Sequence, residues 1–289
     1  MKSTAPVLSQ VLVFLCWCTS FASAQATTSR LIPDDNLSYP VLIRIGASRS
    51  ASGFYLNTGS NIFLVTAAHV LFLSDGRTLI GTQADALSYA GDPKERTPAL
   101  FKLDLKVLTE SGNIKTDNIH DVAVVRIGSV AVVGAERTLT PMAGVEARSA
   151  PISGLVPVGF RTVKRFAEVL VSNEVIVFGY PTSIGIPQDK VPQLDYSRPL
   201  LRKGIVAGTN EALKSIILDC AVYPGNSGGP VVELSRDGAI MRFQIIGVII
   251  QYVPYVPFEQ RGSPDVARNS GYAVAAAMDS VMDLIAAFK

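Results

Sequence analysis

The stretch Gly225-Asn226-Ser227-Gly228-Gly229-Pro230 places one serine among three glycines and ends in a proline. Glycines on both sides allow the backbone to bend tightly and to approach a substrate closely. A side chain at such a bend is exposed, and the neighbouring N–H groups can point outward together. A nucleophilic serine with an oxyanion hole needs this arrangement. Gly, Asn, Ser and Pro also form turns, so the stretch alone fits a tight turn without catalytic function.

Two other motifs precede this stretch and point to the same chemistry. Thr66-Ala67-Ala68-His69 closes the apolar run of residues 61–65, and His120-Asp121-Val122-Ala123-Val124-Val125 opens another apolar run. Histidine, aspartate and serine therefore follow one another along the chain, each at the edge of a strand-like segment. A histidine that takes the serine proton and an acid that orients the histidine are the partners that a serine nucleophile requires.

With these three motifs the sequence resembles the trypsin/chymotrypsin-like serine peptidases, and within them the bacterial HtrA-like branch that carries Gly-Asn-Ser-Gly-Gly-Pro. The resemblance covers residues 36–289. It implies an all-β fold of two six-stranded antiparallel β-barrels with a C-terminal helix. No PDZ-like segment is expected after that helix, which distinguishes the chain from full-length HtrA proteases.

The composition is that of a folded protein with no special affinity for polyanions. Of its 289 residues, 48% are hydrophobic and 17% are charged, which excludes a disordered chain. The formal net charge of +2 gives no indication of a nucleic-acid partner or of an anionic membrane surface.

The N-terminus has the features of a secretory signal peptide over residues 1–24. Lys2 supplies the positive end, residues 11–18 form a short apolar core, and Ala22-Ser23-Ala24 is an A-x-A cleavage site. The alternative is an N-terminal membrane anchor, although the apolar run is short for a bilayer. Removal of this segment leaves Cys220 as the only cysteine, so the mature chain has no internal disulfide. We therefore expect an exported protein, periplasmic or secreted.

Short apolar runs separated by turn residues predict a β-sandwich or β-barrel. Within 101–107, apolar residues alternate with Lys102, Asp104 and Lys106, as in a half-buried strand. Only the end of the chain is convincingly helical, because apolar residues recur there at a spacing of three or four: Val274, Met278, Val281, Ile285 and Phe288. The expected strands cover 40–46, 53–56, 61–66, 100–108, 121–127, 174–179, 204–208, 214–219, 230–233 and 241–251.

The expected organisation follows from this pattern and from the resemblance. After the signal peptide come a flexible mature N-terminus (25–35), an N-terminal barrel (36–140), an inter-barrel connection (141–165) and a C-terminal barrel with the terminal helix (166–289). The stretch 129–165 suggested the connection, because it is rich in Ala, Gly, Pro and Ser and weakly periodic.

The resemblance assigns roles to individual residues. Ser227 is the expected nucleophile, His69 the base and Asp121 the acid that orients it, while the N–H groups of Gly225 and Ser227 form the oxyanion hole. His120 is the fallback base, and structural roles remain the alternative for each polar residue. No cofactor is expected. No metal is expected either, because two histidines and one mature cysteine, none suitably clustered, do not make a transition-metal site.

The resemblance also places the primary substrate pocket. Ala221 and Val222 precede the serine by six and five residues and should form one wall, opposite Ile250 and Gln251. A third side is expected from the segment 270–272. These residues supply no fixed charge, which favours small or medium apolar substrate side chains, unless Glu259 or Asp265 folds into the pocket.

We therefore interpret the chain as an exported serine endopeptidase that hydrolyses protein or peptide substrates through a Ser-His-Asp triad and an acyl-enzyme intermediate. Two alternatives use the same cleft. One is a catalytically inactive, trypsin-like peptide-binding protein, and the other is an esterase with the same triad, since both reactions are acyl transfers.

Overall fold

The structure is a computed structural model that describes residues 32, 36–46, 49–89, 97–133, 136–149, 157–181, 191–196, 198–238, 240–255 and 268–288. The predicted signal peptide and the acidic residues Glu259 and Asp265 lie outside the described residues.

The N-terminal half is a ten-stranded sheet. Its strands are β1 (Pro40–Ile45), β2 (Arg49–Asn57), β3 (Asn61–Ala67), β4 (Gln83–Ser88), β5 (Ala99–Asp104), β6 (Ile114–Asp117), β7 (Val122–Val133), β8 (Glu136–Pro141), β9 (Val145–Ser149) and β10 (Val158–Gly159). The order is β6-β7-β3-β2-β1-β4-β5-β9, with β8 added to β7 and β10 added to β2.

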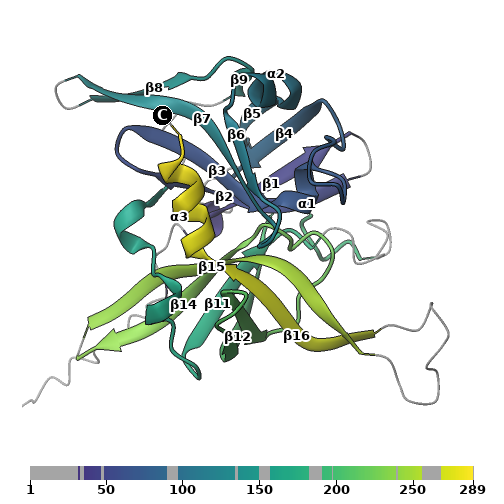
Figure 1. Cartoon of the computed structure of the whole chain (residues 1–289), viewed down its shortest axis with the longest axis vertical. Helices are drawn as coiled ribbons and strands as arrows, with labels where there is room; N and C mark the ends of the chain where they lie inside the picture. Colours follow the sequence, from purple (N-terminus) through teal and green to yellow (C-terminus); the bar gives the residue numbers. More distant parts are fainter. Residues whose placement is uncertain are drawn as a thin grey trace, which may run out of the picture. The chain divides into compact units, whose positions relative to one another are not determined.

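The C-terminal half is a closed, six-stranded antiparallel barrel in the order β11-β12-β13-β16-β15-β14. Figure 1 labels β11, β12, β14, β15 and β16 among its strands. Its strands are β11 (Glu174–Gly179), β12 (Leu200–Asn210), β13 (Ser215–Asp219), β14 (Pro230–Asp237), β15 (Ile240–Tyr255) and β16 (Arg268–Ala277). The all-β fold class is confirmed, and the six-stranded barrel is observed for this half. The N-terminal sheet has ten strands where six were expected, and β8, β9 and β10 are among the additional strands.

Part of the segment expected to connect the barrels is strand. Residues 145–149 form β9, which pairs antiparallel with β5 so that Val145 lies opposite Leu103. The side chains of this stretch are mostly polar and exposed, so their pattern did not indicate a strand, which backbone pairing at a sheet edge nevertheless supports. The remaining domain boundaries stay predictions.

Three α-helices are described: α1 (Ala68–Leu71), α2 (Leu105–Glu110) and α3 (Met278–Ala286). The 3₁₀ turns are η1 (Asn36–Ser38), η3 (Phe160–Thr162) and η4 (Phe166–Glu168). The prediction of strand over 100–108 is wrong after Asp104. The Asp104 carboxylate accepts a hydrogen bond from the N–H of Val107 and thereby caps α2, which ends the alternating segment.

The predicted C-terminal helix is present, but it begins at Met278. Val274, which we assigned to the helix, lies in β16 between Ile217 of β13 and Gln251 of β15. The Ala-rich sequence of β16 has little intrinsic strand preference. Pairing on both sides inside the closed barrel overrides that preference.

The two halves share a hydrophobic core in addition to their separate ones. Both halves belong to one compact unit, Ile32–Lys289. The shared core takes Phe54, Phe63, Val65 and Val124 from the first half, Ile176, Phe178, Val232 and Val248 from the second, and Met278 and Val281 from α3. Each such side chain contributes about 1.5–3 kcal/mol when fully buried. Figure 1 shows α3 at this junction, and the shared core fixes the halves against one another.

Among the described residues, no helix has the length and apolar character needed to cross a membrane.

A buried ion pair attaches the segment between the halves to the C-terminal barrel. The Lys164 ammonium lies 2.7 Å from the Glu233 carboxylate, and their side chains are 9% and 1% exposed. Asn173 donates a second hydrogen bond to the same carboxylate oxygen. Because the backbone N–H of Lys164 also donates to the Ile245 carbonyl, residue 164 is held at two points.

We predict that Lys164→Met lowers the free energy of unfolding by about 3–5 kcal/mol, because it leaves the Glu233 charge buried and unpaired. Denaturant unfolding at neutral pH measures the change. Lys203→Met is the matched control, since its 2.7 Å pair with Glu174 is half exposed on both sides and should contribute at most about 1 kcal/mol. Equal losses in the two variants would contradict a structural role for the buried pair.

Candidate active site

The serine stretch forms a closed turn held by its own asparagine. The N–H of Asn226 donates to the Tyr223 carbonyl at 2.9 Å, and the Asn226 side-chain oxygen accepts from the Tyr223 N–H at 3.0 Å. Gly225 has a φ of 95°, a conformation that favours glycine. Asn226 is 1% exposed, so the turn is braced from within the protein.

Ser52 of β2 holds this turn from the other half of the molecule. Its hydroxyl donates to the Gly225 carbonyl at 2.7 Å and accepts from the Tyr180 N–H at 2.9 Å. Its backbone N–H donates to the Ser227 carbonyl at 2.9 Å. Since Ser52 is fully buried, these three bonds lie in a medium in which breaking them is costly.

Thr66, the first residue of the Thr-Ala-Ala-His motif, supports Ser52. Its buried hydroxyl donates to the Ser52 carbonyl at 2.8 Å. A side chain at Gly228, whose φ is 84°, would collide with that carbonyl and with the Thr66 hydroxyl. The motif and the glycine after the serine are therefore parts of one packed contact.

His69 and Asp121 are hydrogen-bonded within the N-terminal half. Nδ1 of His69, on α1, lies 2.6 Å from Oδ2 of Asp121, so a proton on Nδ1 is donated to the carboxylate. This contact leaves Nε2 as the ring nitrogen able to accept a proton. The side chains are 45% and 31% exposed, so the pair opens to solvent at the cleft.

The backbone fixes this pair as well. Asp121 accepts the His69 N–H through Oδ1 at 2.9 Å, and its carbonyl accepts the Ala68 N–H at 3.0 Å. Asp121 adopts a φ of 56°, which is uncommon for a residue other than glycine. These bonds orient the carboxylate, and the apolar side chain of Ile250 cannot add a hydrogen bond to it. Ile250 instead packs against the N-terminal and shared cores.

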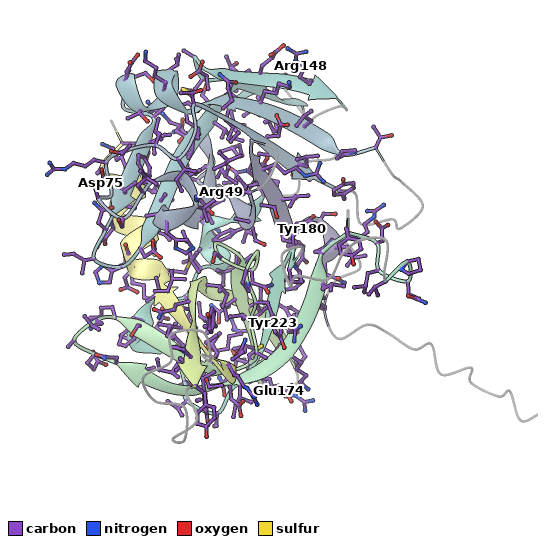
Figure 2. All side chains as sticks on the ribbon, turned by 90° about the vertical axis from the view of Figure 1, so that its right-hand side faces the viewer. Arg49, Asp75, Arg148, Glu174, Tyr180 and Tyr223 are labelled. Atoms are coloured by element: carbon purple, nitrogen blue, oxygen red, sulfur yellow. The ribbon has the colours of Figure 1, made fainter. Side chains whose placement is uncertain are left out.

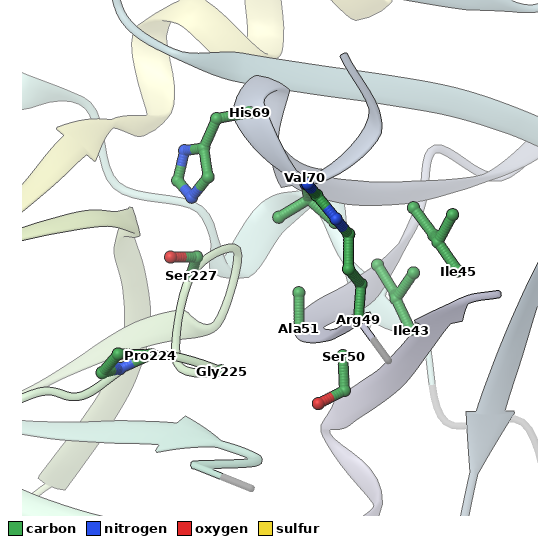
Figure 3. Close-up of a pocket in the computed structure, with 10 residues that line it drawn as sticks. All are labelled: Ile43, Ile45, Arg49, Ser50, Ala51, His69, Val70, Pro224, Gly225 and Ser227. Carbon is green, nitrogen blue, oxygen red and sulfur yellow. The ribbon is translucent and has the colours of Figure 1, made fainter. Parts of the chain in front are cut away.

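Ser227 faces His69 across the cleft between the two halves. Both side chains line the cleft in Figure 3, where the serine oxygen lies below the imidazole. Among the described contacts, no hydrogen bond joins them. Such bonds commonly tighten only when substrate is bound.

The N–H groups of Gly225 and Ser227 are available to a ligand. In the part of the chain that the structure describes, neither donates to a protein acceptor, whereas the N–H groups of Asn226, Gly228 and Gly229 all do. Two unsatisfied donors beside a serine hydroxyl can bind an oxyanion.

His120 belongs to a separate network. Its Nδ1 lies 2.6 Å from Asp117, whose carboxylate also accepts the hydroxyl of Ser280 on α3. Burial opposes ionisation of Asp117, but the bonds from Ser280 and His120 outweigh it and hold its pKa below the ordinary value. The structure therefore places His120 beside α3 and not with Ser227.

A second pocket on the cleft contains most of the residues expected for substrate binding. Val222, Ile250 and Gln251 line it, together with His69 and Ser227. Ala221, which was expected in the wall, does not line it, and four other residues complete the lining. These are Tyr223, Pro224, Ile249 and Tyr252. The segment 270–272 does not line this pocket either.

Cys220 is a buried, free cysteine, and burial raises the pKa of its thiol. It therefore fits the role of a small apolar core residue better than that of a reactive thiolate.

Sequence reasoning missed Ser52 and Asp117. Ser52 lies in an otherwise apolar run, and a buried polar residue inside a strand is the signal that could have identified it. Its partners lie more than 120 residues away in the chain, so no local pattern names them.

The comparison with protein families confirms the resemblance to the trypsin-like peptidases and the trypsin-like fold class. Residues 51–240 match the family model of the trypsin-like peptidase domain. The HtrA-type protease AlgW, solved with a tripeptide, is 15% identical with a TM-score of 0.47, covering 86% of this chain and 60% of its own. Deg5 is 17% identical with a TM-score of 0.46, covering 86% of this chain and 88% of its own. This chain thus spans less than two thirds of the AlgW chain. No curated protein sequence is significantly similar.

We predict that Ser52→Ala lowers stability by about 1–3 kcal/mol, because it leaves the Gly225 carbonyl and the Tyr180 N–H buried without a partner. The kcat should fall by about tenfold. This is a smaller loss than the roughly 10²–10³-fold loss in kcat that removal of an oxyanion-hole donor causes. Ser111→Ala, a similar change at a hydroxyl remote from the cleft, is the control for steady-state kinetics and denaturant unfolding. A Ser52→Ala protein with normal turnover would contradict a positioning role.

Proposed function

This chain belongs to the trypsin-like peptidase family, and on that basis we propose that it is a serine endopeptidase with Ser227 as nucleophile, His69 as general base and Asp121 as orienting acid. The observation that carries the proposal is the 2.6 Å contact between His69 and Asp121 in a cleft that also contains Ser227.

In the proposed mechanism the Ser227 hydroxyl attacks the scissile carbonyl as Nε2 of His69 takes its proton. Asp121 keeps the other ring proton on Nδ1 and stabilises the imidazolium that forms. The imidazolium then protonates the leaving amine. In the second half of the reaction His69 takes a proton from water as the water attacks the acyl-enzyme, and His69 then returns that proton to the Ser227 oxygen.

The N–H groups of Gly225 and Ser227 are proposed to bind the negative oxygen of the tetrahedral intermediate. Donors placed before the reaction need no reorganisation when charge develops, and one such donor is worth about 2.7–4 kcal/mol of barrier. The bond from Ser52 to the Gly225 carbonyl supports this assignment, because it fixes the orientation of the peptide that follows Gly225.

The pocket lined by Val222, Ile250 and Gln251, here called the acyl-side pocket, is proposed to hold the substrate residue before the scissile bond and supports a preference for apolar residues there. Val222, Ile249 and Ile250 offer apolar surface, and no charged residue lines this pocket among the described residues. A charged side chain would lose water there without gaining a partner. Export to the periplasm or the exterior follows only from the N-terminal sequence and remains part of the proposal.

We predict that Ser227→Ala folds normally and loses at least about 10⁴-fold in kcat, and that Asp121→Asn loses about 10⁴-fold near neutral pH. His120→Ala is the control and should lose far less, since its ring bonds Asp117. Peptide and ester turnover, with fluorophosphonate labelling mapped to Ser227, are the measurements.

The outcomes separate the alternatives. Failure of the wild-type protein to label or to turn over any substrate would indicate an inactive peptide-binding protein, whereas ester turnover without peptide turnover would indicate an esterase. A greater loss in His120→Ala than in Asp121→Asn would mean that the base or the acid is misassigned.

We also predict that a mixed peptide library is cleaved mainly after small or medium apolar residues such as Val, Ala or Leu. Burying such a side chain contributes roughly 1.5–3 kcal/mol, and an ionised side chain gains nothing comparable in this pocket. Predominant cleavage after Arg or Lys would show that a carboxylate lines the pocket.

A further inference from the structure

A depression distinct from the acyl-side pocket adjoins Ser227 on the side of the N-terminal sheet. Its volume is about 280 Å³, and it shares His69, Pro224 and Ser227 with the acyl-side pocket. The rest of its lining comes from Gly225 of the serine turn and from β1, β2 and α1, as Figure 3 shows. In the proposed mechanism the acyl part of the substrate occupies the acyl-side pocket. The leaving peptide therefore extends into the depression beside the N-terminal sheet.

The walls of this depression are apolar except at one edge. Ile43, Ile45 and Ala51 are buried side chains that present hydrocarbon to it. Arg49 is exposed at its rim, and its side chain runs past Val70 in Figure 3. Figure 2 labels Arg49 on the N-terminal half and Tyr223 of the acyl-side pocket on the other half.

Arg49 brings a positive charge that no described residue neutralises. Among the ion pairs of the described residues, none includes Arg49, and no aspartate or glutamate lines the depression. A guanidinium binds a carboxylate through two parallel N–H···O bonds. A substrate with a neutral or cationic side chain in place of the carboxylate cannot form this pair.

We propose that this depression binds the leaving-group side of the substrate and selects an acidic residue, Glu or Asp, within the first two positions after the scissile bond. The methylene groups of the substrate side chain contact Ile45 and Ala51, and the carboxylate pairs with Arg49. The proposal rests on the proposed peptidase function and adds a charge preference to the apolar preference on the acyl side.

Arg44 provides a matched control. It lies between Ile43 and Ile45 on β1, and because side chains alternate along a strand it points away from the face that lines the depression. Arg44 is exposed like Arg49, so Arg44→Ala and Arg49→Ala change the net charge equally.

The experiment measures kcat/KM for quenched peptides that share one apolar residue before the scissile bond and carry Glu, Gln or Lys at the first or the second position after it. The wild-type protein should prefer Glu to Gln by roughly fivefold at low salt, as expected for a pair at a solvent-exposed rim. The preference should shrink as ionic strength rises. Arg44→Ala should keep it, Arg49→Ala should abolish it, and Arg49→Glu should favour Lys.

Each variant is judged by its own Glu-to-Gln ratio, so a general loss of activity cancels. Arg49→Lys, which retains the charge, should retain part of the preference and serves if the other variants do not fold. Equal cleavage of the Glu and Gln peptides by the wild-type protein would overturn this inference and leave the peptidase function standing. Absence of cleavage of every peptide, with no fluorophosphonate labelling, would overturn both.

Discussion

The buried hydroxyl of Ser52 connects the two halves of the protein at the turn that carries Ser227. It donates to the carbonyl of Gly225 and accepts from Tyr180, while the Ser52 N–H donates to the carbonyl of Ser227. Because all these groups are withdrawn from water, displacement of the serine turn would leave several polar atoms without partners. The turn that carries Ser227 therefore takes its conformation from the N-terminal sheet as well as from its own barrel.

The same division applies to the candidate catalytic residues. His69 and Asp121 belong to the N-terminal half and orient each other by contacts within it, whereas Ser227 belongs to the C-terminal barrel. The cleft exists only when the halves are packed, and the shared core with α3 supplies the packing. The network of Asp117, His120 and Ser280 ties α3 to the turn that precedes Asp121, so the terminal helix also contacts the vicinity of the site.

The sequence predicted what depends on local pattern. The motifs drew attention to His69 and Ser227, which line one cleft, and to Asp121, which lies against His69. Apolar runs located most strands, including those of the closed barrel. The prediction was wrong at residues 105–108, where a single capping aspartate begins a helix, and at Val274, where barrel pairing overrides an alanine-rich sequence. Ser52 and Arg49 were not identified, because their significance comes from residues far away in the chain.

The most direct test of this account is a crystal structure of the protein after reaction with a fluorophosphonate. The account predicts phosphorus bonded to Ser227, with one phosphonyl oxygen about 2.7–3.1 Å from the nitrogens of both Gly225 and Ser227. It also predicts that the Ser52 hydroxyl still donates to the Gly225 carbonyl in the adduct. An adduct on another residue, or one whose oxygen faces away from these two N–H groups, would contradict the account.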